Sequence, residues 1–337
     1  MWGRRRTAAL GTAALLAAAT LSAAGQPRSH VITAAGTTVP KAYVIAHNGG
    51  VQVLDTSDGT VLTSVNTGAW TTGAAVGPDG RRLYVVNGWA GVITAVDPAA
   101  GKVVGRIDAG AQLAQAVLRP DGERLYVTAT GAVAVVDPKR FRLVAAIRLG
   151  GQPQGIAVSP DGRRLYVANS QDGTVSVIDT HTASRTTAVD VGGLPQHVAI
   201  SPDGDAVYVS SLDLREGTGT VSVIDTRTDR LRWSTPVGKG AGSIAVTPDG
   251  RRVYVALDHG VAVLDTTTRA TKTLRFTAKT LAIAPGDRRV FLATGNTTTV
   301  LDSADDEVLT TFQLSGLNVD GRGFAATAIA FEPPDEP

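Results

Sequence analysis

Residues 159–180 read SPDGRRLYVANSQDGTVSVIDT, and this stretch decides the fold because it recurs along the chain. Its Tyr-Val pair occurs six times, and Phe291-Leu292 stands at the seventh position. Successive positions are 41, 42, 40, 42, 46 and 37 residues apart, a period typical of stacked repeat architectures. The seven aromatic residues are Tyr43, Tyr84, Tyr126, Tyr166, Tyr208, Tyr254 and Phe291.

Each repeat predicts four short strands, lettered a to d. In the clearest repeat we expect them at 155–159, 165–168, 174–178 and 186–191, which are rich in β-branched residues and separated by turn residues. Pro-Asp-Gly at 160–162 is typical of a tight turn between strands a and b. An aspartate ends strand c in every repeat, and we expect its carboxylate to accept hydrogen bonds from the amides of its own turn. These aspartates are Asp55, Asp97, Asp137, Asp179, Asp225, Asp265 and Asp302.

Both faces of these strands are largely apolar, as in a sheet covered on each side by a neighbour. The repeats therefore predict an all-β fold, a seven-bladed β-propeller of four-stranded antiparallel blades. The first repeat lacks strand a, and residues 325–333 match that strand after the last repeat, so we expect the C-terminal strand to complete blade one and close the ring. The expected blades are 41–69 with 325–333, 70–110, 111–150, 151–192, 193–238, 239–276 and 277–314, followed by a tail at 334–337.

The N-terminus has the pattern of a secretory signal peptide. Arg4, Arg5 and Arg6 precede an apolar run that ends in small residues, which predicts a signal peptide at 1–24. The run is short for a membrane span, so we expect no stable span in the exported protein. Residues 25–40 are small and polar and are interpreted as a linker. The expected location is extracellular or associated with the cell envelope.

Charge and composition exclude several classes of function. The chain has 337 residues, 32 basic and 30 acidic, but removing the three arginines of the signal peptide leaves 29 basic and 30 acidic residues. The net positive charge thus belongs to the signal, and a general electrostatic case for nucleic-acid binding has no support. The chain has no cysteine, which excludes disulfides, thiolate metal sites and a cysteine nucleophile.

The segments Tyr166-Val-Ala-Asn169 and Tyr84-Val-Val-Asn87, with the flanking SPDG and VSVIDT, resemble the YVTN-family β-propeller repeat over about residues 41–333. Similar propellers include surface-layer and secreted binding proteins, lactonases, a streptogramin-type lyase, the haem domain of a nitrite reductase and subunits of quinoprotein amine dehydrogenases. The resemblance implies the propeller fold. The repeat motif is scaffold and transfers no catalytic residue to this chain.

The d–a and b–c connections are expected to share one face of the ring, and they vary between repeats, as functional loops do. The positions equivalent to Gln154-Gly155, nearest the channel mouth, carry Thr72, Gln115, Gln154, Gln196-His197, Ser243, Lys279-Thr280 and Thr327. Two tryptophans map to the same face in blade two, either as a hydrophobic plug between blades or as a stacking surface. The candidate ligand-binding residues are His47, Trp70, Trp89, Gln115, Gln154, Gln196, His197, His259 and Lys279.

Three functions remain open. The first is a non-catalytic exported scaffold that binds a protein, peptide or small molecule on this variable face. The second is a lyase or lactone hydrolase in which His197 or His259, in adjacent blades, acts as general acid or base. The third is a subunit of a quinoprotein or haem redox complex. No cofactor is predicted, a histidine pair is too little for a metal site, and we expect a monomer.

Overall fold

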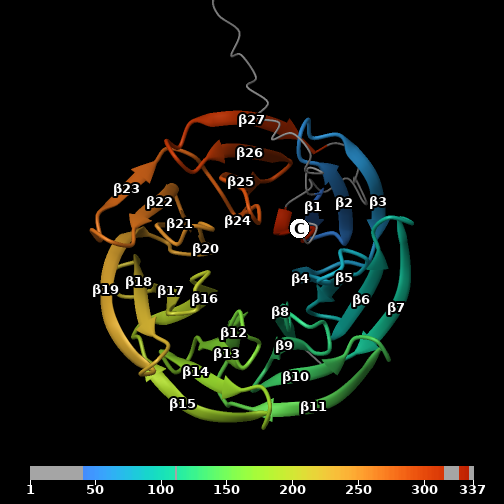
Figure 1. Cartoon of the computed structure of the whole chain (residues 1–337), viewed down its shortest axis with the longest axis horizontal. Helices are drawn as coiled ribbons and strands as arrows, with labels where there is room; N and C mark the ends of the chain where they lie inside the picture. The colour runs from blue at the N-terminus through green and yellow to red at the C-terminus, as the bar shows by residue number, and fades with distance from the viewer. Residues whose placement is uncertain (1–40, 111, 315–325, 334–337) are drawn as a thin grey trace, which may run out of the picture. The chain divides into compact units, whose positions relative to one another are not determined.

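Figure 1 shows the computed structural model along the axis of a ring of seven sheets. The structure describes residues 41–110, 112–314 and 326–333. Within these ranges all helices and strands that the structure assigns are β-strands, numbered β1 to β28. No helix capable of crossing a membrane occurs among these residues. The expected signal peptide (1–24), linker (25–40) and tail (334–337) lie outside the described residues.

Each blade is a four-stranded antiparallel sheet. Blade one contains β28 (Ala326–Phe331), β1 (Lys41–Ala46), β2 (Gly50–Asp55) and β3 (Val61–Asn66), and blade two contains β4 (Thr71–Val76), β5 (Leu83–Asn87), β6 (Val92–Asp97) and β7 (Lys102–Asp108). Blade three contains β8 (Leu113–Leu118), β9 (Leu125–Ala129), β10 (Ala132–Asp137) and β11 (Arg142–Arg148), and blade four contains β12 (Pro153–Val158), β13 (Arg164–Asn169), β14 (Thr174–Asp179) and β15 (Ser184–Asp190). Blade five contains β16 (Leu194–Ile200), β17 (Ala206–Leu212), β18 (Thr218–Asp225) and β19 (Arg230–Lys239). Blade six contains β20 (Ile244–Val246), β21 (Arg252–Leu257), β22 (Gly260–Asp265) and β23 (Thr271–Leu274), and blade seven contains β24 (Thr280–Ile283), β25 (Arg289–Thr294), β26 (Thr297–Asp302) and β27 (Val308–Gln313).

Ring closure by the last strand is confirmed. In blade one, β28 pairs antiparallel with β1, with Ala42 opposite Phe331 and Val44 opposite Ile329. The pairing continues beyond the strands, since the Glu332 N–H donates to the Lys41 carbonyl at 2.9 Å and their side chains form an ion pair at 3.2 Å. The two ends of the propeller sequence are therefore joined within one sheet, and β28 covers the inner edge of β1.

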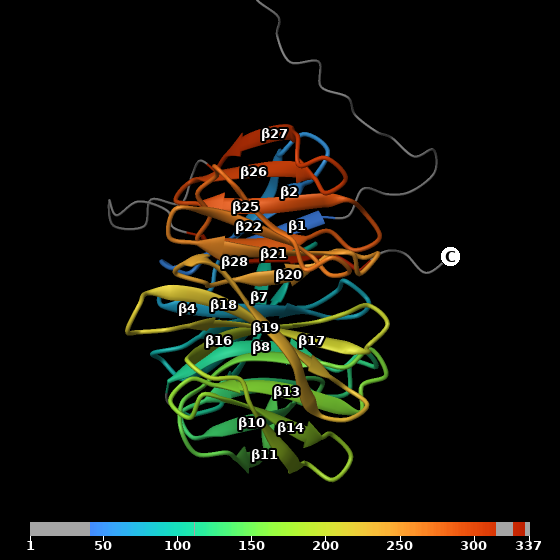
Figure 2. The same ribbon diagram turned by 90° about the vertical axis from the view of Figure 1, so that its left-hand side faces the viewer.

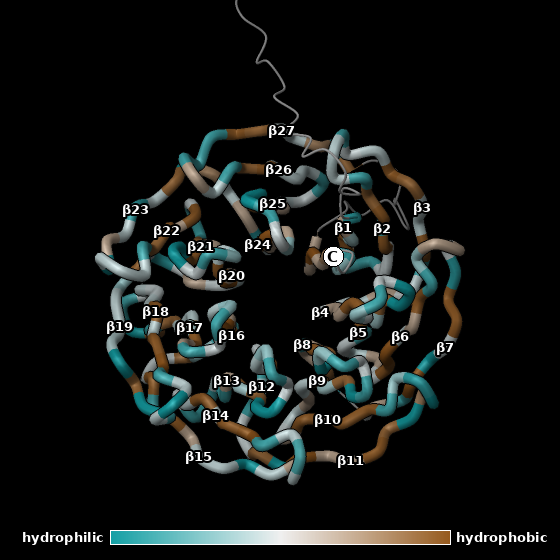
Figure 3. The backbone as a smooth tube through the Cα atoms, in the orientation of Figure 1, coloured by the Kyte–Doolittle hydropathy of each residue, from teal (hydrophilic) through white to brown (hydrophobic). Residues whose placement is uncertain are grey.

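The core lies between the blades. Figure 3 shows hydrophobic residues concentrated in strands such as β6 and β10, and hydrophilic residues in the connections. The motif aromatics are buried throughout, and Tyr166 is fully buried. Each apolar cluster joins neighbouring blades; for example, Val86 of blade two packs in the same cluster as Leu125 of blade three. Since each such side chain contributes about 1.5–3 kcal/mol on burial, adjacent blades stabilise one another.

The strands run roughly along the axis from one face of the ring to the other (Figure 2). The a–b turns (such as 160–162) and c–d turns (such as 179–183) occupy what we call the turn face. The d–a connections (such as 67–70) and b–c connections (such as 88–91) occupy the loop face. These names are kept below.

The turn face repeats in detail. As predicted, the aspartate that ends strand c accepts a hydrogen bond from an amide two or three residues later in all seven blades. The residue four places after each aspartate has a left-handed φ of 51° to 77°, whether or not it is glycine. These residues are Gly59, Gly101, Phe141, Ala183, Asp229, Arg269 and Asp306.

Arginines at the start of strand b clamp one blade to the next. The Arg164 guanidinium of blade four donates to the Thr226 carbonyl of blade five at 2.7 Å. Arg252 makes the same bond from blade six to the Ser303 carbonyl at 2.5 Å. Across the closure, Arg289 of blade seven donates to the carbonyl of Thr56 in blade one at 2.8 Å. These contacts stabilise the boundaries between blades, in addition to the strand pairing inside each blade.

Candidate ligand-binding site

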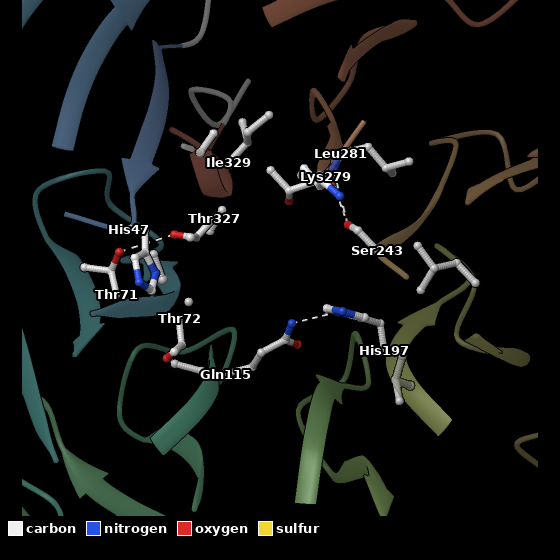
Figure 4. A pocket seen from close by; sticks show the side chains of 18 residues that line it. His47, Thr71, Thr72, Gln115, His197, Ser243, Lys279, Leu281, Thr327 and Ile329 are labelled. Carbon is white, nitrogen blue, oxygen red and sulfur yellow. Dashed lines mark hydrogen bonds between the residues drawn. The ribbon is translucent and has the colours of Figure 1, made fainter. Parts of the chain in front are cut away.

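A cavity of about 490 Å³ lies where the innermost strands meet around the axis. Figure 4 shows side chains of several blades converging on it. Six blades each contribute the residue five places before the proline that ends strand a, and blade one adds His47 from its b–c loop. The six equivalent residues are Gly73, Gln115, His197, Ser243, Thr280 and Ala328. The scaffold position repeats, whereas the side chain placed on it does not.

Blade four is missing from the lining, and its equivalent residue is Gly155. A Cβ atom there would lie 2.6 Å from the Cα of His197, so β12 and β16 pack too closely for any side chain. Gln115 of blade three and His197 of blade five meet across this gap, with Gln115 Nε2 and His197 Nδ1 2.7 Å apart (Figure 4). This bridge makes one wall of the cavity from blades that are not neighbours.

Burial lowers the pKa of His197 to about 4. The imidazole is therefore neutral at pH 7, and Nδ1 accepts the hydrogen bond from the Gln115 amide, which leaves the ring proton on Nε2. A base of this pKa removes protons weakly near neutral pH. The geometry suits His197 to hydrogen bonding of a ligand better than to proton abstraction.

Hydroxyl groups of the lining are held by the inner strands. Thr71 Oγ1 donates to the Ala46 carbonyl at 2.5 Å and lies 3.3 Å from Thr327 Oγ1. Ser243 Oγ bonds the amide of Leu281 in blade seven at 3.2 Å. Among the described lining residues no aspartate or glutamate occurs, and Lys279 supplies a positive charge. The cavity thus presents hydrogen-bond donors and a cation.

His47, Trp70 and Trp89 come together as a line of three rings on the loop face. The His47 and Trp70 ring centroids are 4.9 Å apart at 86°, and those of Trp70 and Trp89 are 6.1 Å apart at 50°. Trp70 is 50% exposed and Trp89 74% exposed. The expectation of a hydrophobic plug between blades is therefore wrong for Trp89, and the alternative of an exposed stacking surface describes the pair.

Three sequence candidates lie away from the cavity. Gln196 points its amide to Ser170 Oγ at 3.1 Å, in the neighbouring b–c loop. Gln154 contributes its backbone carbonyl to Thr128 Oγ1 at 2.7 Å. His259 is exposed in the turn between β21 and β22 and is absent from the lining that contains His197.

The sequence predicts the pairs Gln154-Gly155 and Gln196-His197 at the channel mouth but does not decide which member of a pair lines the cavity, and in blade five it is His197. Irregular pairing at the start of β12 and β16, after Pro153 and Pro195, shifts the register there. In the part of the chain that the structure describes, no group of three or more His, Cys, Asp or Glu residues is placed to hold a metal ion.

No protein-family model and no curated protein sequence matches the chain. Among solved structures, it is similar to hydrazine synthase of Kuenenia stuttgartiensis, with a TM-score of 0.64 and 24% identity over 69% of this chain and 76% of that one. It is also similar to a functionally unknown protein from Desulfotomaculum acetoxidans, with a TM-score of 0.70 and 17% identity over 88% of this chain and 99% of the other. At these identities the likeness shows the fold alone, the β-propeller, and a fold does not select a function.

Proposed function

We propose that this chain is an exported β-propeller of the YVTN type that binds a small ligand with an acidic or hydrogen-bond-accepting group in the channel cavity. The observation that carries the proposal is the lining itself. The inner strands place four unlike polar side chains at equivalent positions around a cavity of about 490 Å³, a volume that suits a small molecule. These side chains belong to Gln115, His197, Ser243 and Thr280. Repetition of the scaffold with divergence at these positions is what a binding role requires.

The charge of the lining indicates the kind of ligand. Lys279 has no carboxylate beside it among the described lining residues, and the neutral His197 and Gln115 offer N–H groups. A carboxylate would satisfy the lysine and accept these hydrogen bonds, whereas a cationic ligand would find no counter-charge. The signal peptide that the sequence predicts at 1–24 supports a role outside the cell.

Binding is favoured over the lyase or lactonase alternative by the state of His197. Its low pKa and its bond to Gln115 leave it a poor general base. No carboxylate among the described lining residues is placed to raise that pKa. The lining orients a ligand through fixed donors, and His197, the base proposed from the sequence that lies in it, accepts protons weakly near neutral pH.

Thermal unfolding with a panel of small carboxylic acids and their neutral amides tests the proposal. A carboxylate present at about 100 times its Kd should raise the Tm by about 5 °C or more, and its amide should not. Lys279→Met should abolish the shift, and Lys102→Met, which removes an exposed lysine on the outer strand β7, should leave it intact. Equal shifts in both variants would contradict the proposal, as would lactone turnover that His197→Ala abolishes.

A further inference from the structure

The three-ring line of His47, Trp70 and Trp89, called the aromatic platform from here on, is held rigidly. The Trp70 N–H donates to the His47 carbonyl at 2.8 Å, and the Trp70 carbonyl accepts from the Gly88 N–H at 2.9 Å. The Gly88 carbonyl in turn accepts from the Leu113 N–H of blade three at 3.0 Å. Backbone bonds thus connect the loops of three blades, so the rings are positioned before any ligand arrives.

Trp70 adopts a left-handed backbone conformation with φ of 64°. Such a conformation is uncommon for a bulky side chain and persists only where the surroundings enforce it. The motif asparagine of blade two helps enforce it, because the buried Asn87 amide donates to the carbonyls of Gly68 and Ala69 at 2.9 and 3.3 Å. A scaffold residue of the repeat therefore fixes the loop that carries the indole.

Both indole side chains are exposed to solvent, Trp89 more than Trp70. The residues next to the indoles are glycine and alanine, with Ala69 before Trp70, and Gly88 and Ala90 on either side of Trp89. Because the indoles are tilted by 50° and contact each other, they offer outward faces rather than a slot between parallel rings. That geometry suits a flat, rigid group laid on one indole, and it does not form the walled groove that clamps a proline side chain.

The aromatic platform is continuous with the cavity. His47 belongs to both, since it lines the cavity and packs its ring against Trp70. A second connection is Gly88, where a Cβ would lie 2.7 Å from the Thr72 side chain of the lining. His47 and Thr72 therefore connect the tryptophans with the lining that contains the hydrogen-bond donors and Lys279.

We propose that the aromatic platform and the cavity together bind an acidic oligosaccharide. A sugar ring has an apolar C–H face that stacks on an exposed indole and hydroxyl groups at its edge that bond Thr, Gln and His side chains. Its carboxylate complements Lys279 in a lining without described acidic groups. The carboxylate part rests on the proposed function, whereas the stacking part stands on the rings alone.

Calorimetric titration of the full chain with trigalacturonate, cellotriose and galacturonate tests this. Trigalacturonate should bind, and Trp89→Ala and Trp70→Gly should each weaken it about tenfold or more. Glycine is chosen at position 70 because it accepts the left-handed φ. Leu214→Ala, which truncates another exposed apolar side chain on the loop face (70% exposed), should leave the affinity unchanged. Lys279→Met should weaken trigalacturonate and leave cellotriose unaffected.

The outcomes separate the two proposals. If galacturonate binds through Lys279 but the tryptophan variants bind trigalacturonate as tightly as the wild type, the platform is overturned and the cavity function stands. If both trisaccharides bind through the tryptophans and ignore Lys279→Met, the platform is supported, and the acidic ligand falls together with the cavity function. If a proline-rich decapeptide binds the tryptophans more tightly than trigalacturonate, the saccharide assignment is overturned.

Discussion

The two faces of the ring are built from the same seven repeats and use their polar groups in opposite ways. On the turn face, every strand-c aspartate bonds an amide of its own turn, and arginines bond the carbonyl groups of the next blade. On the loop face, equivalent inner positions carry Gln115, His197 and Ser243, and the rings of blades one and two stand exposed. Polar residues that repeat in every blade hold the turns and the blades together, whereas polar and aromatic residues that differ between blades line the cavity or stand exposed. This contrast distinguishes scaffold residues from candidate binding residues before any ligand is known.

Opening the ring should produce the largest effect, because closure is the element that every blade depends on. Ending the chain after Leu314 removes β28, so β1 loses its inner partner and the apolar surface around Val44 is exposed. We expect a fall in Tm of more than about 10 °C in calorimetry, with loss of a single cooperative transition. A chain ended after Pro333 keeps β28 and serves as the control. An unchanged transition after the longer truncation would show that blade one closes without β28.

Asp306 tests the turn face at a single residue. Its side chain is 3% exposed, pairs with Arg252 and Lys272, and accepts a hydrogen bond from the Tyr254 hydroxyl. Asp306→Ala leaves these groups without their acceptor and should lower the free energy of unfolding by about 2–4 kcal/mol. Asp306→Asn keeps an acceptor and tolerates the left-handed φ of 64°, so it should cost less.

The matched substitution on the loop face is Trp89→Ala, which removes a ring that is 74% exposed. It should change the free energy of unfolding by no more than about 0.5 kcal/mol, measured by urea denaturation beside the Asp306 variants. A loss as large as that of Asp306→Ala would break the division between a structural turn face and an available loop face.

His197 is the loop-face residue whose side chain we expect to affect stability, and its effect should appear as a pH dependence of the free energy of unfolding. Its folded pKa of about 4 lies below the unfolded value of about 6.5, so the unfolded chain binds a proton in this window that the folded chain does not. The stability contribution of the neutral ring is full above pH 6.5 and is lost as the pH falls toward 4. His197→Gln, which retains a partner for Gln115, should remove this dependence.

Urea denaturation at pH 7 and pH 5 measures that difference. Between these values the free energy of unfolding of the wild type should fall by about 2 kcal/mol more than that of His197→Gln. That amount corresponds to the roughly 1.5 pH units between the unfolded pKa of about 6.5 and pH 5. Equal losses in the two proteins would mean that the imidazole titrates normally, and the preference for hydrogen bonding over proton transfer at this residue would then lose its basis.

The sequence predicts the repeated part of this molecule well because turn chemistry is local. The aspartates act within four residues of themselves, and the closing strand is visible as an unmatched strand a. The site is harder to predict because it depends on register. One irregularity after Pro195 decides that His197, and not Gln196, faces the channel, and the bridge from Gln115 needs the absence of a side chain at Gly155. The repeat locates the pair Gln196-His197 without deciding which member lines the cavity, and the alignment of rings from two blades is not visible in it.

A further expected effect concerns backbone strain, which occurs on both faces. Left-handed residues recur at the same turn-face position in all seven blades, whereas on the loop face the non-glycine residues with a left-handed φ are Trp70 and Gln112, each directly before strand a. Trp70→Gly removes the ring and relieves the backbone, while Trp70→Ala removes the ring and keeps the strained φ. The free energy of unfolding measured in urea should therefore be about 1 kcal/mol higher for Trp70→Gly than for Trp70→Ala. Ala183→Gly, at φ of 51° on the turn face, should gain a similar amount over the wild type. If the two variants at position 70 are equally stable while Ala183→Gly gains, the loop at Trp70 has relaxed, and the indole is not held in place by its backbone.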